Sequence, residues 1–203
     1  MATYDSNHVK NIALLGHPGS GKTTLAESML FESGLIKRRG SVIAKNTVSD
    51  YHELETERQS SVFSSLMHTV WRDYKINIID TPGYDDFSGE LISALRVADT
   101  GLLILNAAVG VEVGTDVIWE YTDNFKTPTV FVVNQIDKEA ADFDKTLQEA
   151  KNHFLSFTSQ ENPKLYQATL LAWDVDLKSR AINPGTSADL TVATILAMHL
   201  LLG

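Results

Sequence analysis

The residues of this sequence best suited to chemistry form a glycine-rich turn near its beginning. Residues 16–23 read Gly-His-Pro-Gly-Ser-Gly-Lys-Thr, between an apolar run at 11–15 and a helix-like segment at 24–31. Glycines let backbone N–H groups approach phosphate oxygens closely and tolerate positive φ angles. The following helix contributes its positive dipole end, Lys22 contributes a charge, and the Thr23 hydroxyl can bind Mg²⁺. The pattern therefore predicts a loop that binds the phosphates of a nucleotide.

A second motif follows the apolar strand-like segment 75–79 and reads Asp80, Thr81, Pro82, Gly83. Asp80 at a strand end can hold Mg²⁺ through its water shell. The N–H of Gly83 can meet a γ-phosphate and move when that phosphate leaves. Alone, the tetrapeptide is an ordinary turn. With the phosphate loop upstream, it indicates a site for a metal-bound triphosphate.

A third motif, Asn134-Gln135-Ile136-Asp137, follows the strand-like segment 129–133. A carboxylate there can accept hydrogen bonds from the N1–H and the exocyclic amine of guanine. Adenine has neither donor, so such a site can discriminate by roughly 10⁴. Ligands of open α/β sheets lie beyond the carboxyl ends of the strands, where all three motifs fall. Together they indicate guanine, and Asp137 argues against the alternative of an ATPase.

Apolar strand-like segments alternate with amphipathic helix-like segments along the chain. The strands are expected at 11–16, 69–72, 75–80, 101–106 and 129–134, and the helices at 23–32, 90–98, 114–125 and 143–157. This alternation predicts an α/β fold with a doubly wound, mostly parallel sheet of about six strands. A hairpin joined at Asp73-Tyr74 adds one antiparallel edge strand. Residues 40–61 contain no clear element, and loops of that length are usually functional.

Composition narrows the class of protein. The 203 residues include 17 Lys and Arg against 26 Asp and Glu, which argues against an autonomous nucleic-acid-binding protein, of DNA in particular, although an acidic domain can still contact RNA within a larger assembly. The absence of cysteine excludes disulfides and thiolate metal sites. The charged N-terminus does not resemble a secretion signal, and the apolar run at 195–202 is too short to span a bilayer. We expect a cytoplasmic monomer without a membrane partner.

Further stretches accompany the three motifs in order along the chain. They are 16–24, Glu57-Arg58, 76–83 with Asp86-Phe87, 95–99, 108–112, and 134–137 with 141–143. With them, residues 9 to about 150 resemble the GTP-binding domain of translational GTPases, above all elongation factor G and its elongation factor G-like paralogues. The resemblance implies a P-loop NTPase fold, binding of GTP and GDP with Mg²⁺, hydrolysis of GTP, and the ribosome as partner. In that family, separate downstream domains carry out translocation.

The resemblance also implies a role for each matching residue. The implied metal ligands are Thr23, Ser61 and Asp80, and the implied catalytic group is Tyr84 with Lys22 and Gly83. The implied nucleotide-binding residues are His17, Pro18, Gly19, Ser20, Gly21, Lys22, Thr23, Thr24, Asp80, Gly83, Asn134, Gln135, Asp137 and Lys138, with Ser187 and Ala188 from the tail.

Several residues depart from the family pattern. The family's Glu-Arg-Gly-Ile-Thr-Ile is here Glu-Arg-Gln-Ser-Ser-Val at 57–62, so Ser61 is the matching hydroxyl. Tyr84 stands where the family has a catalytic histidine. A phenol, which ionises at about pH 10, suits this task less well than an imidazole does. Positioning or proton-transfer groups contribute roughly 10² to 10⁴ in rate. The alternative is therefore a GTP-binding module that hydrolyses slowly or not at all.

Two departures concern affinity rather than hydrolysis. Gln135 replaces a lysine whose stem lies along the base and braces the phosphate loop. We expect weaker nucleotide binding with guanine preference retained through Asp137. Gly19 replaces an aspartate of the standard elongation factors and removes a carboxylate near the phosphates.

The tail is open to three interpretations. We expect residues 1–158 to form the GTP-binding domain and 159–203 to be its end or an appended, mainly helical segment. In the first interpretation, 164–173 is a last strand, and Ser187-Ala188 is the loop over guanine, before a helix at 190–202. In the second, 180–190 resembles a C-terminal segment of triphosphoribosyl-dephospho-CoA synthase proteins, as in a fused chain. In the third, Ser187 or Asp189 simply caps a helix.

Overall fold

The computed structural model describes residues 4–49, 52, 55, 57, 60–83 and 88–154. In chain order the elements are the 3₁₀ turn η1 (Ser6–His8), β1 (Val9–Leu15), α1 (Lys22–Glu32), β2 (Ser65–Trp71), β3 (Tyr74–Asp80), α3 (Ser88–Leu95), β4 (Thr100–Asn106), α4 (Val113–Asn124), β5 (Thr129–Asn134) and α5 (Phe143–Phe154).

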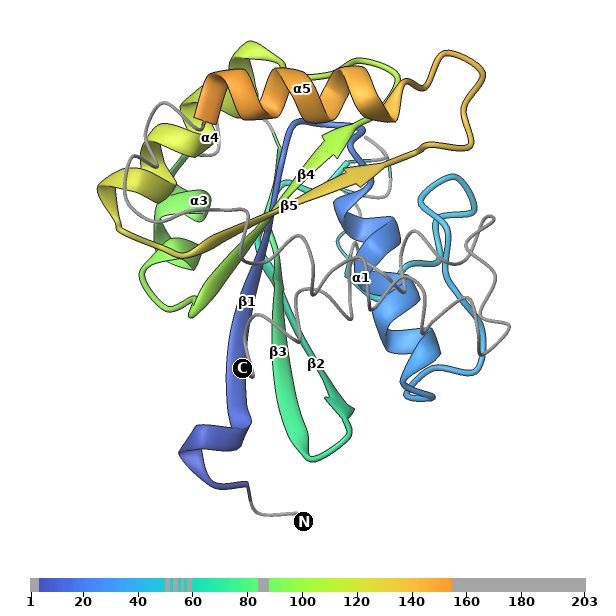
Figure 1. Cartoon of the computed structure of the whole chain (residues 1–203). Coiled ribbons are helices and arrows are strands. Elements are labelled where there is room, and N and C mark those ends of the chain that lie inside the picture. The colour runs from blue at the N-terminus through green and yellow to red at the C-terminus, as the bar shows by residue number, and fades with distance from the viewer. Residues whose placement is uncertain are drawn as a thin grey trace, which may run out of the picture.

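The strands of the described residues form one five-stranded sheet in the order β2-β3-β1-β4-β5 (Figure 1). β1 pairs in parallel with β3 and β4, and β4 pairs in parallel with β5. β2 is antiparallel to β3 and lies at the edge of the sheet. The predicted mostly parallel α/β sheet with one antiparallel edge strand is therefore confirmed. The sixth strand expected at 164–173 lies outside the described residues.

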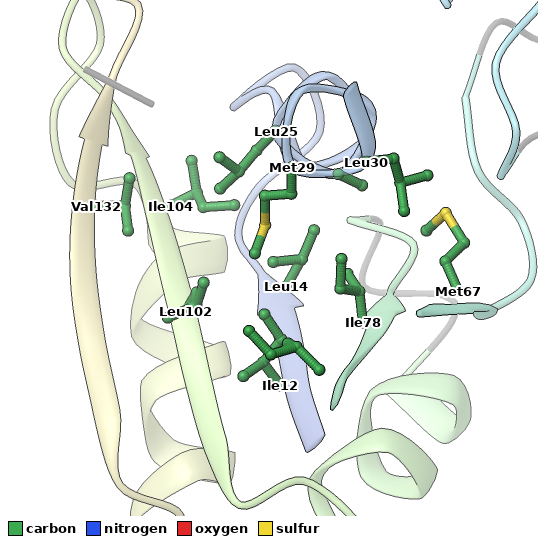
Figure 2. Packing of buried hydrophobic residues seen from close by; sticks show 12 residues of the cluster. Ile12, Leu14, Leu25, Met29, Leu30, Met67, Ile78, Leu102, Ile104 and Val132 are labelled. Carbon is green, nitrogen blue, oxygen red and sulfur yellow. The ribbon is translucent and has the colours of Figure 1, made fainter. Parts of the chain in front are cut away.

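Helices cover both faces of this sheet. α1 lies on one face, and α3, α4 and α5 lie on the other (Figure 1). Figure 2 shows Leu25, Met29 and Leu30 of α1 directed toward apolar side chains from all five strands. These side chains are Ile12, Leu14, Met67, Ile78, Leu102, Ile104 and Val132. Each fully buried aliphatic side chain contributes about 1.5–3 kcal/mol, so this packing holds the start of α1 firmly against the end of β1.

The opposite face has its own apolar cluster. Leu15, Leu103 and Leu105 of the sheet pack there against α3, α4 and α5. The helices contribute Leu91, Ala94, Leu95, Ile118 and Ala150. Because β4 is buried on both faces, its sequence is almost continuously apolar, as expected for a strand inside a parallel sheet.

The start of β2 differs from the prediction. β2 begins at Ser65 rather than at residue 69, because its pairing with β3 continues to the Ser65–Asp80 pair. Ser65, Met67 and Thr69 are buried while the residues between them are exposed. The mixed polarity of these buried positions hid the start of the strand.

The hairpin turn and the end of α3 are also corrected. Trp71 pairs with Tyr74, so the turn is Arg72-Asp73 rather than Asp73-Tyr74. α3 ends at Leu95 rather than at residue 98. The backbone of Asp99 already pairs with Asn11 of β1, at 2.8 Å, which draws the chain out of the helix toward β4.

The carboxyl ends of the four parallel strands meet at one edge of the sheet. β1 ends at Leu15, β3 at Asp80, β4 at Asn106 and β5 at Asn134. The loops that follow these residues carry the three predicted motifs. Among the described residues, no helix combines the length and apolar character needed to cross a membrane.

Candidate functional site

The loop between β1 and α1 takes a shape that only glycine accommodates. Gly16, Gly19 and Gly21 have φ angles of 141°, 79° and 96°. A Cβ atom on Gly16 would lie 2.5 Å from the carbonyl oxygen of Ile104 and 2.8 Å from Ser20 Oγ. Gly21 caps α1 in the left-handed conformation, so the free N–H groups of the first helical turn open onto this loop.

Lys22 folds its side chain back across the loop. Its Nζ donates hydrogen bonds to the carbonyl oxygens of Gly16 at 2.7 Å and His17 at 3.1 Å. A Cβ on Gly83 would lie 2.5 Å from Lys22 Nζ and 2.7 Å from the backbone nitrogen of Pro18. The first two motifs are therefore in contact, and Gly83 fits there only because it lacks a side chain.

Three side-chain oxygens gather beside this contact. Thr23 Oγ1 donates a hydrogen bond to Asp80 Oδ2 at 2.8 Å, and Ser61 Oγ lies 3.3 Å from Thr23 Oγ1. Asp80 is 1% exposed and Thr23 is 9% exposed. Carboxylate and hydroxyl oxygens are the donors that suit a hard cation such as Mg²⁺. Nowhere in the described part of the chain do three or more His, Cys, Asp or Glu side chains form a group able to hold a metal.

The third motif reaches the phosphate loop from β5. Asn134 Nδ2 donates to the carbonyl oxygen of Ser20 at 2.8 Å, and Gln135 Nε2 donates to that of Gly19 at 2.5 Å. Gln135 adopts a φ of 60°, an uncommon value for a residue with a side chain. Asn106 Nδ2 in turn donates to Gln135 Oε1 at 3.3 Å.

Asp137 and Lys138 lie exposed beyond the end of β5. The turn that carries them is closed by the N–H of Lys138, which donates to the carbonyl oxygen of Gln135 at 3.2 Å. On the phosphate loop, Gly19 is exposed and Ser20 is buried, and Thr24 is exposed in the first turn of α1. The remaining predicted site residues, Tyr84, Ser187 and Ala188, lie outside the described residues.

Two residues at this edge were missed by sequence reasoning. Asn106 supports Gln135, and Glu112 Oε2 lies 3.2 Å from His17 Nδ1 at the start of α4. Asn106 pairs with Asn134 in the sheet register. A polar residue that ends an apolar strand was a usable signal for Asn106. Glu112 lies in the stretch 108–112 that contributes to the resemblance, but nothing local in the sequence shows that α4 begins beside His17.

Residues 7–198 match the family described as the elongation factor Tu GTP binding domain. This chain belongs to that family. The predicted P-loop fold and the predicted GTP-binding, elongation factor G-like GTPase domain are thereby confirmed at the level of the family.

Curated relatives of this chain carry related names. Ribosome-releasing factor 2, mitochondrial, of Candida dubliniensis is 41% identical over 71% of this chain and 18% of its own length. The protein of the same name from Anopheles gambiae is 34% identical over 88% of this chain and 26% of its own length. Elongation factor G 2 of Borreliella burgdorferi is 35% identical over 72% of this chain and 22% of its own length.

A solved structure agrees with these relatives. A crystal structure of a protein from Thermus thermophilus aligns with a TM-score of 0.69 and 34% identity, over 72% of this chain and 22% of that one. The chain thus spans between about a fifth and a quarter of the length of these proteins. Because two of the relatives are named as mitochondrial, the cytoplasmic location stays a prediction.

Proposed function

We propose that this chain is the nucleotide domain of an elongation factor G-like translational GTPase, which binds GTP with Mg²⁺ and acts as a ribosome-linked switch. One observation carries the proposal: three turns far apart in sequence meet at one edge of the sheet. Thr23, Ser61 and Asp80 bring oxygens together, while Asn134 and Gln135 hold the phosphate loop from the other side.

The phosphate loop supplies the charge and the donors for a triphosphate. Its backbone N–H groups and the end of α1 would cradle the phosphates, with Lys22 at the β and γ positions. Its ammonium group now lies on two carbonyl oxygens of the loop, so nucleotide binding would exchange these contacts for phosphate oxygens. Gly83, in contact range of Lys22, would place its N–H at the γ-phosphate.

The side-chain oxygens of Thr23, Ser61 and Asp80 form a group, the oxygen cluster, that fits a magnesium ion. Thr23 and Ser61 would be direct ligands, and Asp80 would hold the water shell. Mg²⁺ bound there supplies charge neutralisation of the β- and γ-phosphates. A loop that closes through Ser61 in the triphosphate state and opens afterwards would make the domain a switch.

A second candidate function is a guanine-nucleotide-binding module that hydrolyses GTP very slowly or not at all. Tyr84 in place of the family histidine favours it. Both candidates share the same binding site, so they differ in the rate of hydrolysis and not in the ligand.

The partner and the tail belong to the same proposal. Relatives named as ribosome-releasing and elongation factors support the ribosome as partner, reached through the full-length factor. The family match extends to residue 198, which supports the interpretation that 159–203 completes the domain and that Ser187-Ala188 contacts guanine. We propose a cytoplasmic monomer.

The test is a titration of fluorescent GDP and GTP analogues against the wild type and Asp137→Ala. We expect Asp137→Ala to weaken binding of both by about 100-fold or more, because two hydrogen bonds to guanine lose their acceptor. Asp144→Ala removes an exposed aspartate of α5 and should bind like the wild type. ATP should not displace the labelled GDP. Equal affinity of wild type and Asp137→Ala would remove the guanine assignment.

A further inference from the structure

Residues 61–64 connect the oxygen cluster to the sheet. At one end, Ser61 Oγ lies 3.3 Å from Thr23 Oγ1, and at the other end β2 begins with Ser65. Val62 between them is 7% exposed, so its side chain anchors this short peptide to the body of the domain. What holds its backbone therefore decides where the Ser61 hydroxyl lies.

Glu55 holds the first half of this peptide. Its side chain is fully buried, and its Oε1 accepts hydrogen bonds from the N–H groups of Val62 and Phe63, each at 3.0 Å. Its Oε2 accepts one from the N–H of His52 at 3.4 Å. A carboxylate is costly to bury unless donors surround it, and here backbone N–H groups serve as the donors.

Glu90 holds the second half from another element. It lies in the first turn of α3, the helix that follows the Gly83 turn, and its Oε2 accepts the N–H of Ser64 at 2.9 Å. Three consecutive backbone N–H groups, from Val62 to Ser64, are thus bound by two carboxylates, one that precedes Ser61 in the chain and one from α3.

We propose that Glu55 and Glu90 are positioning residues for the Ser61 hydroxyl. Glu55 fixes the peptide that carries it, and Glu90 ties that peptide to α3, so that a displacement of the helix after Gly83 moves Ser61 away from Thr23. This rests on the proposed function, because it takes Ser61 as a ligand to the magnesium of the GTP state. Both carboxylates act through backbone N–H groups, and neither belongs to the residues proposed to bind the nucleotide.

The test measures how the binding of a non-hydrolysable GTP analogue depends on Mg²⁺ concentration. Glu90→Ala should raise the Mg²⁺ concentration for half-maximal binding by about tenfold or more, as a lost charge-assisted hydrogen bond implies. Glu90→Gln should lie near the wild type, because its amide oxygen still accepts the Ser64 N–H. Glu55→Ala should act like Glu90→Ala, and Glu120→Ala, at an exposed glutamate of α4, is the control. GDP binding should change little in every variant.

A double-variant comparison separates positioning from general stability. Ser61→Ala should raise the Mg²⁺ requirement by a similar factor, and adding Glu90→Ala to it should cause no further loss. Additive losses would overturn the inference, as would a Glu90→Ala variant with the Mg²⁺ dependence of the wild type.

Hydrogen exchange in the nucleotide-free chain gives a second readout that requires no ligand. The amide of Ser64 should exchange faster in Glu90→Ala than in the wild type. If the wild type binds guanine nucleotides but Ser61→Ala and Glu90→Ala leave the Mg²⁺ dependence unchanged, this inference fails and the proposed function stands. If the wild type binds no guanine nucleotide, the proposed function fails, and the role of Glu90 as a positioning residue fails with it.

Discussion

At the scale of the residue, Gln135 connects the third motif, residues 134–137, to the phosphate loop. Its Nε2 donates to the carbonyl oxygen of Gly19 at 2.5 Å, and its Oε1 accepts from Asn106 at 3.3 Å. An amide can therefore brace the loop without the charge of the lysine that the family pattern has here. The weaker affinity expected for Gln135 stays a prediction, but its physical cause is the lost charge rather than a lost brace.

Gln135→Ala tests this brace. We expect the affinity for GDP to fall about five- to tenfold, because a hydrogen bond to the loop is worth about 1 kcal/mol. Fluorescence titration of a labelled GDP measures the change. Gln148→Ala, which removes an exposed amide of α5, is the matched control and should bind like the wild type. An unchanged affinity of Gln135→Ala would show that Asn134 alone holds the loop.

At the scale of the element, α1 organises the loop that follows it. Glu27 on this helix is fully buried, and its carboxylate accepts the N–H of Gly40 at 2.8 Å and the N–H of Val48. A Cβ on Gly40 would lie 2.7 Å from Glu27 Oε2, so the glycine is needed for this approach. The two ends of the stretch from Gly40 to Val48 are thus tied to one side chain of a core helix.

Glu27→Ala should lower the free energy of unfolding by about 2–4 kcal/mol, because two backbone N–H groups lose a charged acceptor. Glu27→Gln should cost less, since its amide oxygen still accepts one of them. Urea unfolding followed by circular dichroism measures both. Glu32→Ala, at an exposed position near the end of α1, should stay within about 0.5 kcal/mol of the wild type. A Glu27→Ala variant as stable as the wild type would mean that water replaces the carboxylate.

At the scale of the whole molecule, the chain contains a nucleotide domain and only a part of what its relatives contain. It spans 18% to 26% of the ribosome-releasing factor 2 proteins compared above. The proposed nucleotide binding uses only the edge of the sheet described here. The resemblance to elongation factor G implies that separate downstream domains carry out translocation, so we expect this chain alone to bind nucleotide without translocating anything.

Single-turnover hydrolysis of GTP, with and without ribosomes, distinguishes the two proposed functions. We expect hydrolysis by the chain alone to be slow, because Tyr84 replaces a group worth roughly 10² to 10⁴ in rate. Ribosomes should accelerate it if the domain is a working GTPase. The control is Glu120→Ala, which changes an exposed residue of α4. Gly19→Ala would not serve as a control, because the φ of 79° at Gly19 disfavours a side chain. GTP that stays intact in the presence of ribosomes would favour the non-hydrolysing module.

The sequence by itself predicted the fold class, the order of the elements and the positions of the three turns. Strands 101–106 and 129–134 were predicted within a residue of β4 and β5, because a buried parallel strand is a short apolar run between polar turns. The phosphate loop could be read from its glycines, because positive φ angles require them. The strands and the glycine-rich turn depend on residues that are adjacent in the sequence, so a sequence pattern is enough to predict them.

Only the tertiary structure decided which side chains support the site. Glu27, Glu55 and Glu90 have no motif of their own, since a buried glutamate looks the same in sequence as an exposed one, and the position of Asn106 at a strand end does not reveal its partner. Each is defined by partners that the packing of helices on the sheet brings near it, such as Asn106 and Gln135, 29 positions apart. A buried carboxylate is stable only where backbone N–H groups surround it, and their positions follow from the fold as a whole.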